Sequence, residues 1–397
     1  MKREKIALLV LSILVPFGLT VAADRSIGYL SEGRNLIFQR FSRAHYDTPE
    51  FTVDSRINNL GFRDRDFRVE KSRRFRVMAI GDSFTYGWGL PAEESWPKIL
   101  EQRLLSRGYD VEVANLGQPG ASPSDYAKVA LQAIPLLKPD LVIVGVLQGD
   151  DLAQALYQTV GTAEKLKRIV RGLYPNFVEM ARGSGEREET DLRLAWKQQA
   201  ADLLAGFSPD EAARFGRLDL EIRSLFLAGQ LNPALVTLGV RTPEYFRKSL
   251  ALQTPEVRRA IGAVSSELLR IRNVSQRTRG RVIVVSVPFG IYTSPLKLET
   301  YARLGFLVED DMLKTTSMDD ATKAASLGAG LDFYDLTAPF RELGRCQELF
   351  FRLDGHFNPA GSRLFAQDLE PIVATELDHL GASVTGAQAG SAKQDGL

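Results

Sequence analysis

The chain has 397 residues and a formal net charge of +1, and 44% of its residues are hydrophobic. This balance of charge argues against a dedicated nucleic-acid-binding protein, which would need a basic face. The single cysteine, Cys346, excludes an intrachain disulfide framework, and with so few cysteines and histidines a metal site is not expected. The length suits one large globular domain with an insertion, or two domains.

The first 23 residues indicate where the protein works. Residues 1–5 are basic, residues 6–19 are apolar, and residues 21–23 (Val-Ala-Ala) offer the small side chains that a signal peptidase requires. The alternative is a retained anchor, since residues 6–23 are near the lower limit for spanning a bilayer. In both cases we expect an exported bacterial protein, periplasmic or extracellular, and in the second case one that is held at the inner membrane.

Five short, β-branched runs are separated by helical patterns along the chain. They are residues 75–80, 111–115, 141–147, 281–287 and 331–335. Continuous apolar runs that alternate with helices are typical of a parallel sheet covered on both faces. The sequence therefore predicts an α/β fold.

Residues 153–275 lack strong strand patterns. Three helix starts in which Ser or Thr precedes Pro and an acidic residue occur there, at Ser208, Thr242 and Thr254. We expect a mostly helical insertion between the third and fourth strands. Trp196 in this insertion either packs the insertion's own core or helps to shape a substrate pocket.

The predicted boundaries divide the chain into six segments. They are a signal peptide or anchor at 1–23, a lead-in at 24–70, the first part of the main domain at 71–152, the insertion at 153–275, the second part of the main domain at 276–380 and a tail at 381–397. The lead-in contains Asn58-Asn-Leu-Gly61, which predicts a hairpin turn. The tail is rich in Gly, Ala, Ser and Gln, a composition typical of disorder.

Residues suited to a catalytic or binding site stand at the carboxyl ends of three predicted strands. Ser83, Gly117 and Asp150 each follow such an end directly. In open α/β sheets, ligand sites lie outside the carboxyl ends of the strands, so these residues point to one crevice. Ser83 lies on a strand-to-helix turn, where its hydroxyl can be exposed, and we expect the neighbouring Asp82 to be a turn residue.

His356 is the candidate base among the three histidines. It follows Asp354 and Gly355 just before the last predicted helix, whereas His379 lies within a helix and His45 in an irregular segment. A serine needs a base to become a nucleophile, and the base needs a partner to orient it. The alternative is that His356 is a helix-entry residue and Asp354 only caps a turn.

Together these motifs resemble the SGNH (GDSL-like) hydrolase superfamily, in particular its exported bacterial esterases and O-acetyltransferases. The four blocks that carry the resemblance, in the family's order, are Gly81-Asp-Ser-Phe-Thr-Tyr-Gly87, Asn115-Leu-Gly117, Gly149-Asp-Asp151 and Asp354-Gly-His356. The similarity covers residues 71–152 and 280–372 and leaves the middle of the chain uncovered.

The resemblance implies a three-layer, flavodoxin-like fold with a five-stranded parallel sheet. It also implies that Ser83 attacks an acyl carbonyl while His356 takes its proton and Asp354 orients the imidazole. The N–H groups of Ser83 and Gly117, with the residue at position 150, would form the oxyanion hole. Such a mechanism needs no metal and no organic cofactor.

The chain departs from the family pattern at two positions. The third block usually supplies an Asn side chain to the oxyanion hole, but Asp150 stands there and is acceptor-only when ionised. Asp150 is then held protonated, or Gln148 donates in its place, or catalysis is impaired. The family's Asp commonly lies three residues before the His, where this chain has Leu353; an Asp two residues before the His, like Asp354, occurs in some O-acetyltransferase relatives.

From export and the resemblance, the expected substrate is an acyl ester, acetyl esters included, linked to carbohydrate. A polysaccharide O-acetyltransferase, a lipid esterase and a catalytically impaired glycan-binding subunit are the alternatives. Tyr86 and Trp88, next to Ser83, either stack on a sugar ring or pack beneath the turn. The sequence predicts no nucleic-acid partner and leaves the oligomeric state open.

Overall fold

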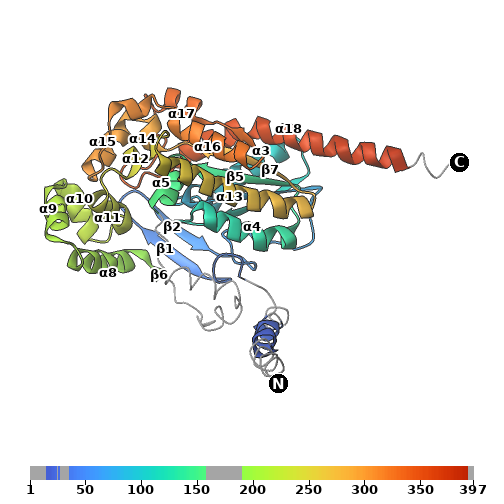
Figure 1. The fold of residues 1–397 in the computed structure, drawn as a ribbon, viewed down its shortest axis with the longest axis horizontal. Helices are drawn as coiled ribbons and strands as arrows, with labels where there is room; N and C mark the ends of the chain where they lie inside the picture. The colour runs from blue at the N-terminus through green and yellow to red at the C-terminus, as the bar shows by residue number, and fades with distance from the viewer. Residues whose placement is uncertain (1–14, 25, 27–34, 158–189, 392–397) are drawn as a thin grey trace, which may run out of the picture.

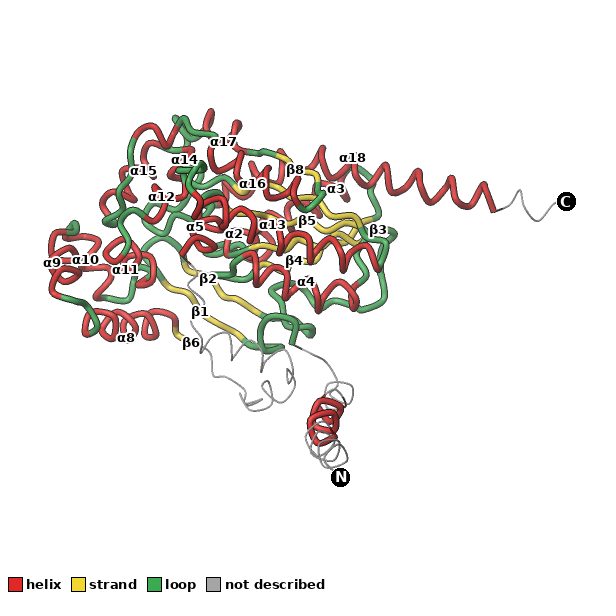
Figure 2. Tube along the Cα trace, in the orientation of Figure 1, coloured by secondary structure: helices red, strands yellow, loops and turns green. Residues whose placement is uncertain are grey.

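A five-stranded sheet with strand order β4-β3-β5-β7-β8 forms the centre of the fold. All neighbouring strands are parallel. In chain order the strands are arranged 2-1-3-4-5, which is flavodoxin-like and confirms the predicted fold. The strands, yellow in Figure 2, are β3 (Phe75–Gly81), β4 (Val111–Gly117), β5 (Leu141–Leu147), β7 (Arg281–Val287) and β8 (Asp332–Tyr334). The computed structural model describes residues 15–24, 26, 35–157 and 190–391.

Helices cover both faces of this sheet and give the fold its three layers (Figure 1). One outer layer contains α3 (Trp96–Ser106) and α18 (Pro359–Ser391), and the other contains α4 (Pro123–Leu137), α13 (Pro255–Arg277) and α16 (Ser317–Gly328). In β3, Val77 and Ala79 pack with the first layer, whereas Met78 and Ile80 pack with the second. Because successive side chains of a strand point to opposite faces, each apolar strand is buried on both sides.

Short helices follow the strands at the edge of the sheet where the polar motifs lie. Directly after β3 comes α2, after β5 comes α5, and after β7 comes α14. The bounds of these and the remaining short elements of the main domain are α2 (Ser83–Tyr86), α5 (Asp150–Tyr157), α14 (Gly290–Thr293), α15 (Pro295–Arg303), α17 (Thr337–Leu343) and the 3-10 turns η1 (Ala92–Glu94) and η2 (Asp310–Leu313).

The described part of the insertion is mainly helical. Its elements are β6 (Thr190–Asp191), α8 (Leu192–Ala205), α9 (Pro209–Arg217), α10 (Leu220–Leu227), α11 (Pro233–Arg241) and α12 (Tyr245–Ser249). Ser208 and Thr254 are the N-caps of α9 and α13, as their Pro-acid context predicts. Thr242 instead ends α11, and α12 begins three residues later.

The boundary of the insertion predicted at residue 275 needs correction. Helix α13 packs its Val264, Leu268 and Ile271 in the same core cluster as α4 and the sheet, so it belongs to the main domain. Its amphipathic pattern could not be told from that of the insertion helices before it, because periodicity shows a buried face but not the partner of that face. Residues 158–189 of the predicted insertion lie outside the described residues.

The lead-in contains a β-hairpin whose turn differs from the predicted one. Strands β1 (Arg43–Asp47) and β2 (Thr52–Arg56) are antiparallel and join at residues 48–51, and β6 adds to β1 in parallel. The predicted turn at residues 58–61 follows β2 instead, where the Asn58 side chain accepts the N–H groups of Leu60 and Phe62. The Asn-rich sequence did predict a turn, but this turn joins no two strands.

The two ends of the chain differ in how far the structure describes them. Residues 15–24 are helical, and among the described residues no helix is both long and apolar enough to cross a membrane. At the other end α18 continues to Ser391, so most of the segment predicted to be disordered, residues 381–397, is helical instead. After Pro371 no proline interrupts this helix, and each added residue gains one backbone hydrogen bond.

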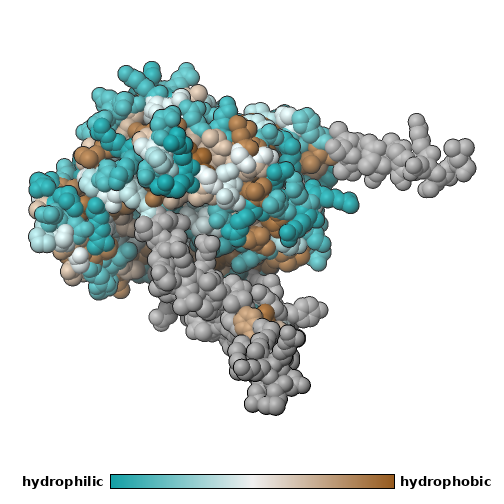
Figure 3. All heavy atoms as spheres, viewed as in Figure 1, coloured by the Kyte–Doolittle hydropathy of each residue, from teal (hydrophilic) through white to brown (hydrophobic). Residues whose placement is uncertain are grey.

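The face of the molecule in Figure 3 is mainly hydrophilic, with apolar residues in small separate areas. Such scattered apolar residues are usual on a folded chain.

A buried ion pair lies at the start of the sheet. Arg76 of β3 donates from Nε to Glu112 of β4 at 2.7 Å, and their side chains are 0% and 4% exposed. The remaining guanidinium N–H groups donate to the carbonyls of Arg68, Val69, Glu70 and Leu137. Arg76 therefore ties the lead-in and the end of α4 to the sheet.

We expect Arg76→Met to lower the free energy of unfolding by about 3–5 kcal/mol, because it leaves Glu112 buried without its partner charge. Arg73→Met is the matched control, since Arg73 pairs with Asp110 at the surface and such pairs contribute about 0–1 kcal/mol. Urea denaturation of the two variants measures the difference. Equal losses in both variants would contradict this role of Arg76.

Candidate active site

Ser83 lies at the sharp turn from β3 into α2. Asp82 is the N-cap of this helix, and its side chain accepts the N–H of Phe84 at 2.9 Å, which confirms the prediction that Asp82 is a turn residue. The end of β4 packs tightly below the turn, since a Cβ on Gly117 would lie 2.0 Å from the Tyr86 nitrogen. The Ser83 N–H is one of the N–H groups that a helix start leaves without an intrahelical acceptor.

Ser83, His356 and Asp354 are joined by a chain of hydrogen bonds. The distance between Ser83 Oγ and His356 Nε2 is 2.7 Å, and His356 Nδ1 contacts Asp354 Oδ1. Because an ionised carboxylate only accepts, Nδ1 carries the proton of the neutral imidazole and Nε2 is free to accept the Ser83 hydroxyl. This is the arrangement that activates a serine.

The surroundings of His356 favour its protonated form. Burial, the largest single influence, lowers the pKa of His356, but the net shift is above the ordinary value, and the charge and hydrogen bond of Asp354 contribute most to that rise. The carboxyls of Asp82 and Asp150 act in the same direction. An imidazolium formed during proton transfer would thus be stabilised where it forms.

Asp150 is held by two donors from helical segments. Gln154 Nε2 donates to Oδ2 at 2.6 Å, and the Tyr245 hydroxyl donates to Oδ1 at 3.2 Å. Burial raises the pKa of Asp150, and these two hydrogen bonds and His356 oppose that rise. Burial, followed by the charge of Asp150, also raises the pKa of the nearby Asp82 to about 7.

Neither partner of Asp150 was found from the sequence. Gln154 lies four residues after Asp150 on α5, and this spacing is the only local signal that could have indicated the pair. Tyr245 comes from α12 in the insertion, about a hundred residues away, and no local pattern links it to the site.

The proposed alternative donor, Gln148, is not available. Its Nε2 donates to Asp319 Oδ1 at 2.7 Å and Thr337 Oγ1 at 2.6 Å, and its Oε1 accepts the Phe289 N–H. Its side chain is therefore fully used in joining the end of β5 to α16, to α17 and to the segment after β7, and that hypothesis was wrong.

The Gly117 N–H also forms a hydrogen bond that the sequence did not indicate. Its N–H donates to the Asn115 side chain at 3.0 Å, so this group does not face the crevice as a free donor, and its predicted oxyanion role needs correction. Gly120 follows in the same loop, with φ of 71° and an exposed position, and within the described chain its N–H has no acceptor. The loop is fixed beside Ser83 because the Gln118 N–H donates to the Gly81 carbonyl.

Three aromatic residues near Ser83 differ in their roles. Tyr86 is buried and its hydroxyl lies 2.6 Å from Ser55 Oγ, which identifies it as a packing residue. Trp88 is half-buried, and its Nε1 donates to Asp354 Oδ2 at 3.2 Å. Trp196 of α8 stacks on Trp88 at 6.2 Å, so the insertion reaches the site rather than packing only on itself.

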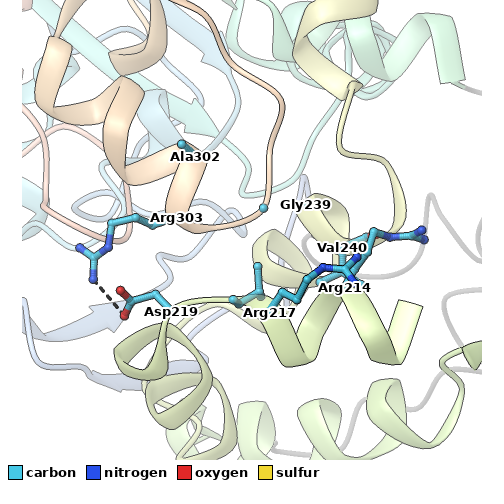
Figure 4. A pocket seen from close by; sticks show the side chains of 9 residues that line it. Arg214, Arg217, Asp219, Gly239, Val240, Ala302 and Arg303 are labelled. Atoms are coloured by element: carbon cyan, nitrogen blue, oxygen red, sulfur yellow. Dashed lines mark hydrogen bonds and ion pairs between the residues drawn. The ribbon is translucent and has the colours of Figure 1, made fainter. Parts of the chain in front are cut away.

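A cavity of about 460 Å³ lies between the insertion and α15 (Figure 4), and Ser83 is not among the residues that line it. Arg303 of α15 forms an ion pair with Asp219 at 3.2 Å across it, and Arg214 Nε donates to the Val240 carbonyl at 2.7 Å. The Arg303–Asp219 pair joins the main domain to the insertion, whereas the Arg214–Val240 contact joins α9 to α11 within the insertion. Among the residues that the structure describes, no group of three or more His, Cys, Asp or Glu side chains is placed to hold a metal ion.

Comparisons with known proteins bear on the family. The model of the GDSL-like Lipase/Acylhydrolase family matches residues 77–369. An arylesterase of Vibrio mimicus is 35% identical over 81 residues, which are 19% of this chain and 38% of that protein. Esterase TesA of Pseudomonas aeruginosa is 33% identical over 79 residues, 19% of this chain and 37% of that protein. The chain thus spans less than two fifths of the length of these curated relatives.

Solved structures with a similar course of the chain include TesA, with 11% identity, a TM-score of 0.36 and coverage of 76% of this chain and 99% of that one. The acetyl xylan esterase AlAXEase has 11% identity, a TM-score of 0.38 and coverage of 75% and 99%. The family model takes in the sheet and all four motif blocks and covers well over half of the chain. The resemblance seen in the sequence is therefore confirmed, and this protein belongs to the GDSL-like lipase/acylhydrolase family, the SGNH hydrolases.

Proposed function

We propose that this protein is an exported serine esterase that hydrolyses acyl esters, acetyl esters among them, on carbohydrate. The observation that supports this function most strongly is the 2.7 Å contact between Ser83 Oγ and His356 Nε2, with Asp354 behind the imidazole. Membership in the GDSL-like lipase/acylhydrolase family gives the same reaction class.

In the first half of the reaction, Ser83 Oγ attacks the acyl carbonyl carbon as its proton moves to His356 Nε2. The carbonyl oxygen becomes an oxyanion, and the imidazolium is stabilised by Asp354. The carbon–oxygen bond to the alcohol then breaks, and His356 gives its proton to the departing alkoxide. The products are the free alcohol and an acyl ester on Ser83.

In the second half, water enters the site and gives a proton to His356 as its oxygen attacks the acyl carbon. The bond to Ser83 Oγ breaks and the proton returns to Ser83, which releases the carboxylic acid and restores the enzyme. A sugar hydroxyl in place of water would give transfer of the acyl group. Analysis of products with and without a glycan acceptor separates these outcomes.

The oxyanion would be held by the N–H groups of Ser83 and Gly120 rather than by that of Gly117. Both donors belong to turns that are fixed by other contacts, and preorganised donors of this kind stabilise the transition state. Asp150 stands where the family supplies a third donor. A protonated Asp150 would donate, and its burial favours the protonated form.

Two observations support a ring-shaped substrate such as a sugar. Trp88 is half-buried, with its ring centroid 6.0 Å from that of His356. Tyr46 of the lead-in lies 4.9 Å from Trp88 by the same measure. Aromatic rings beside the base can stack on the apolar face of a sugar ring, and the predicted export makes envelope or extracellular glycans accessible.

We expect a fluorophosphonate to label the full-length chain at one site per molecule, and Ser83→Ala to abolish the label. Intact-mass measurement of both proteins checks this. The probe needs an activated serine but no knowledge of the natural ester. A folded wild-type protein that stays unlabelled would contradict the esterase proposal and favour a glycan-binding role without catalysis.

Asp150→Asn tests the state of this carboxyl: an ionised Asp150 predicts a higher rate of labelling in the variant. Loss of one oxyanion donor typically costs about 10²–10³-fold, so an amide at this position should give an increase of at least about tenfold if the carboxyl is ionised. Asp310→Asn, at an exposed position, is the control for a change of charge. A lower rate in Asp150→Asn would instead identify the carboxyl as a working part of the site.

The labelling rate should rise with pH, with a midpoint above 6.5. His356 must be neutral to accept a proton, and its pKa is raised above that ordinary value, so the reactive form appears only as pH increases through the raised pKa. Asp354→Asn removes the main raising interaction; its midpoint should fall, and its maximal rate should fall by about 10³-fold or more. A rate that is independent of pH between 5 and 9 would contradict a role for His356 as base.

A further inference from the structure

We propose that Glu50, in the turn of the β1–β2 hairpin, is a positioning residue that holds the loop carrying Asp354 and His356. This inference rests on the proposed esterase function, and it makes the lead-in a part of the active site. The residue lies about 300 positions before the loop, outside all four motif blocks.

The loop is closed at its base by its own backbone. The Phe351 N–H donates to the His356 carbonyl at 2.8 Å, and Phe350 forms a β-bridge with Phe357. At its tip, Gly355 has φ of 84°, a region that favours glycine. These contacts fix the ends of the loop. No carbonyl of the loop, however, accepts the N–H group of Leu353 or that of Asp354.

Glu50 supplies that acceptor. The Leu353 N–H lies 2.9 Å from each of its carboxylate oxygens, and the Asp354 N–H donates to Oε2 at 2.7 Å. Hydrogen bonds to an ionised carboxylate are stronger than neutral ones. They fix the backbone of Asp354 itself, so they set the direction in which its side chain leaves toward His356.

Lys297 of α15 holds the same loop from the carbonyl side. Its Nζ donates to the Phe351 carbonyl at 2.5 Å and to the Arg352 carbonyl at 2.7 Å. The Glu50 carboxylate thus accepts two N–H groups of the loop, and the Lys297 ammonium donates to two of its carbonyls. On the third side, Trp88 Nε1 donates to Asp354 Oδ2.

Charged groups of both signs surround the Glu50 carboxylate. The charged groups that face Glu50 are Lys297, Asp354 and Arg352. Burial raises the pKa of Glu50, and the hydrogen bonds from the Leu353 and Asp354 N–H groups oppose that rise. Burial also lowers the pKa of Lys297 to about 8, and the charge of Glu50 opposes that fall. A half-buried carboxylate is costly unless its partners are in place, so Glu50 and the loop order each other.

The test compares wild type, Glu50→Gln and Glu50→Ala as full-length chains. Glu348→Gln is the matched control, because Glu50 and Glu348 both line a second cavity, of about 420 Å³, beside the loop, and Glu348 also acts on Lys297. Unlike that of Glu50, the exposed carboxylate of Glu348 bonds to no other group of the described chain. The first readout is the rate of fluorophosphonate labelling against pH. The second is the low-field NMR signal of the His356 Nδ1 proton, which reports its hydrogen bond to Asp354 without requiring activity.

We expect Glu50→Ala to lower the labelling rate about 10- to 100-fold, since small misplacements of catalytic groups have effects of this size. Its pH midpoint should move down, because a displaced Asp354 raises the pKa of His356 less, while burial still lowers it and Asp82 and Asp150 still raise it. Glu50→Gln, which keeps one acceptor oxygen, should be intermediate, and Glu348→Gln should match wild type. A loss of stability alone would reduce the active fraction but would not move the midpoint.

Each outcome decides one of the two proposals. A folded Glu50→Ala with the rate, midpoint and low-field signal of wild type overturns the positioning role. If Glu50→Ala does not fold, a Glu50→Gln variant that behaves like wild type overturns it equally. If wild type is never labelled, the esterase proposal fails, and the NMR signal alone then decides: its loss in the Glu50 variants supports the positioning role, and its retention overturns it.

Discussion

The hydrogen bond between Ser83 and His356 is the contact on which the site depends. It joins the turn after the first strand of the sheet to the loop before the last helix, 273 residues later. Parallel strands bring these segments to one edge, because the carboxyl ends of all five strands lie on the same side. The tight glycine contact at Gly117 and the cap at Asp82 then hold the serine within reach of the imidazole.

The site has an excess of carboxyl groups around His356. Asp82, Asp150 and Asp354 all act on His356, and each raises its pKa. Only Asp354 touches the imidazole, so the other two favour the imidazolium without orienting it. The same negative charge would oppose an oxyanion unless Asp150 is protonated, so the state of this one carboxyl connects proton transfer to oxyanion stabilisation.

The sequence predicted the parallel sheet and the edge at which its motifs gather from local patterns, but the strand order only through the resemblance to the SGNH family. Apolar runs predict strands, and turn residues after them predict where polar groups gather. It did not predict the roles of Gly117 and Gln148, whose hydrogen-bonding groups are used by Asn115, Asp319 and Thr337. The contacts of Glu50 and Tyr245 were also missed, since both reach the site from segments far away in the chain, where no spacing rule applies. The domain limit at α13 failed for a related reason, because a helical pattern does not say which core it faces.

The most direct test of the proposed mechanism is a crystal structure of the full-length chain after reaction with a fluorophosphonate. We expect phosphorus bonded to Ser83 Oγ, with the phosphoryl oxygen accepting the N–H groups of Ser83 and Gly120 and with His356 still bonded to Asp354. Phosphorus on another residue, or a phosphoryl oxygen that meets neither N–H group, would contradict the mechanism.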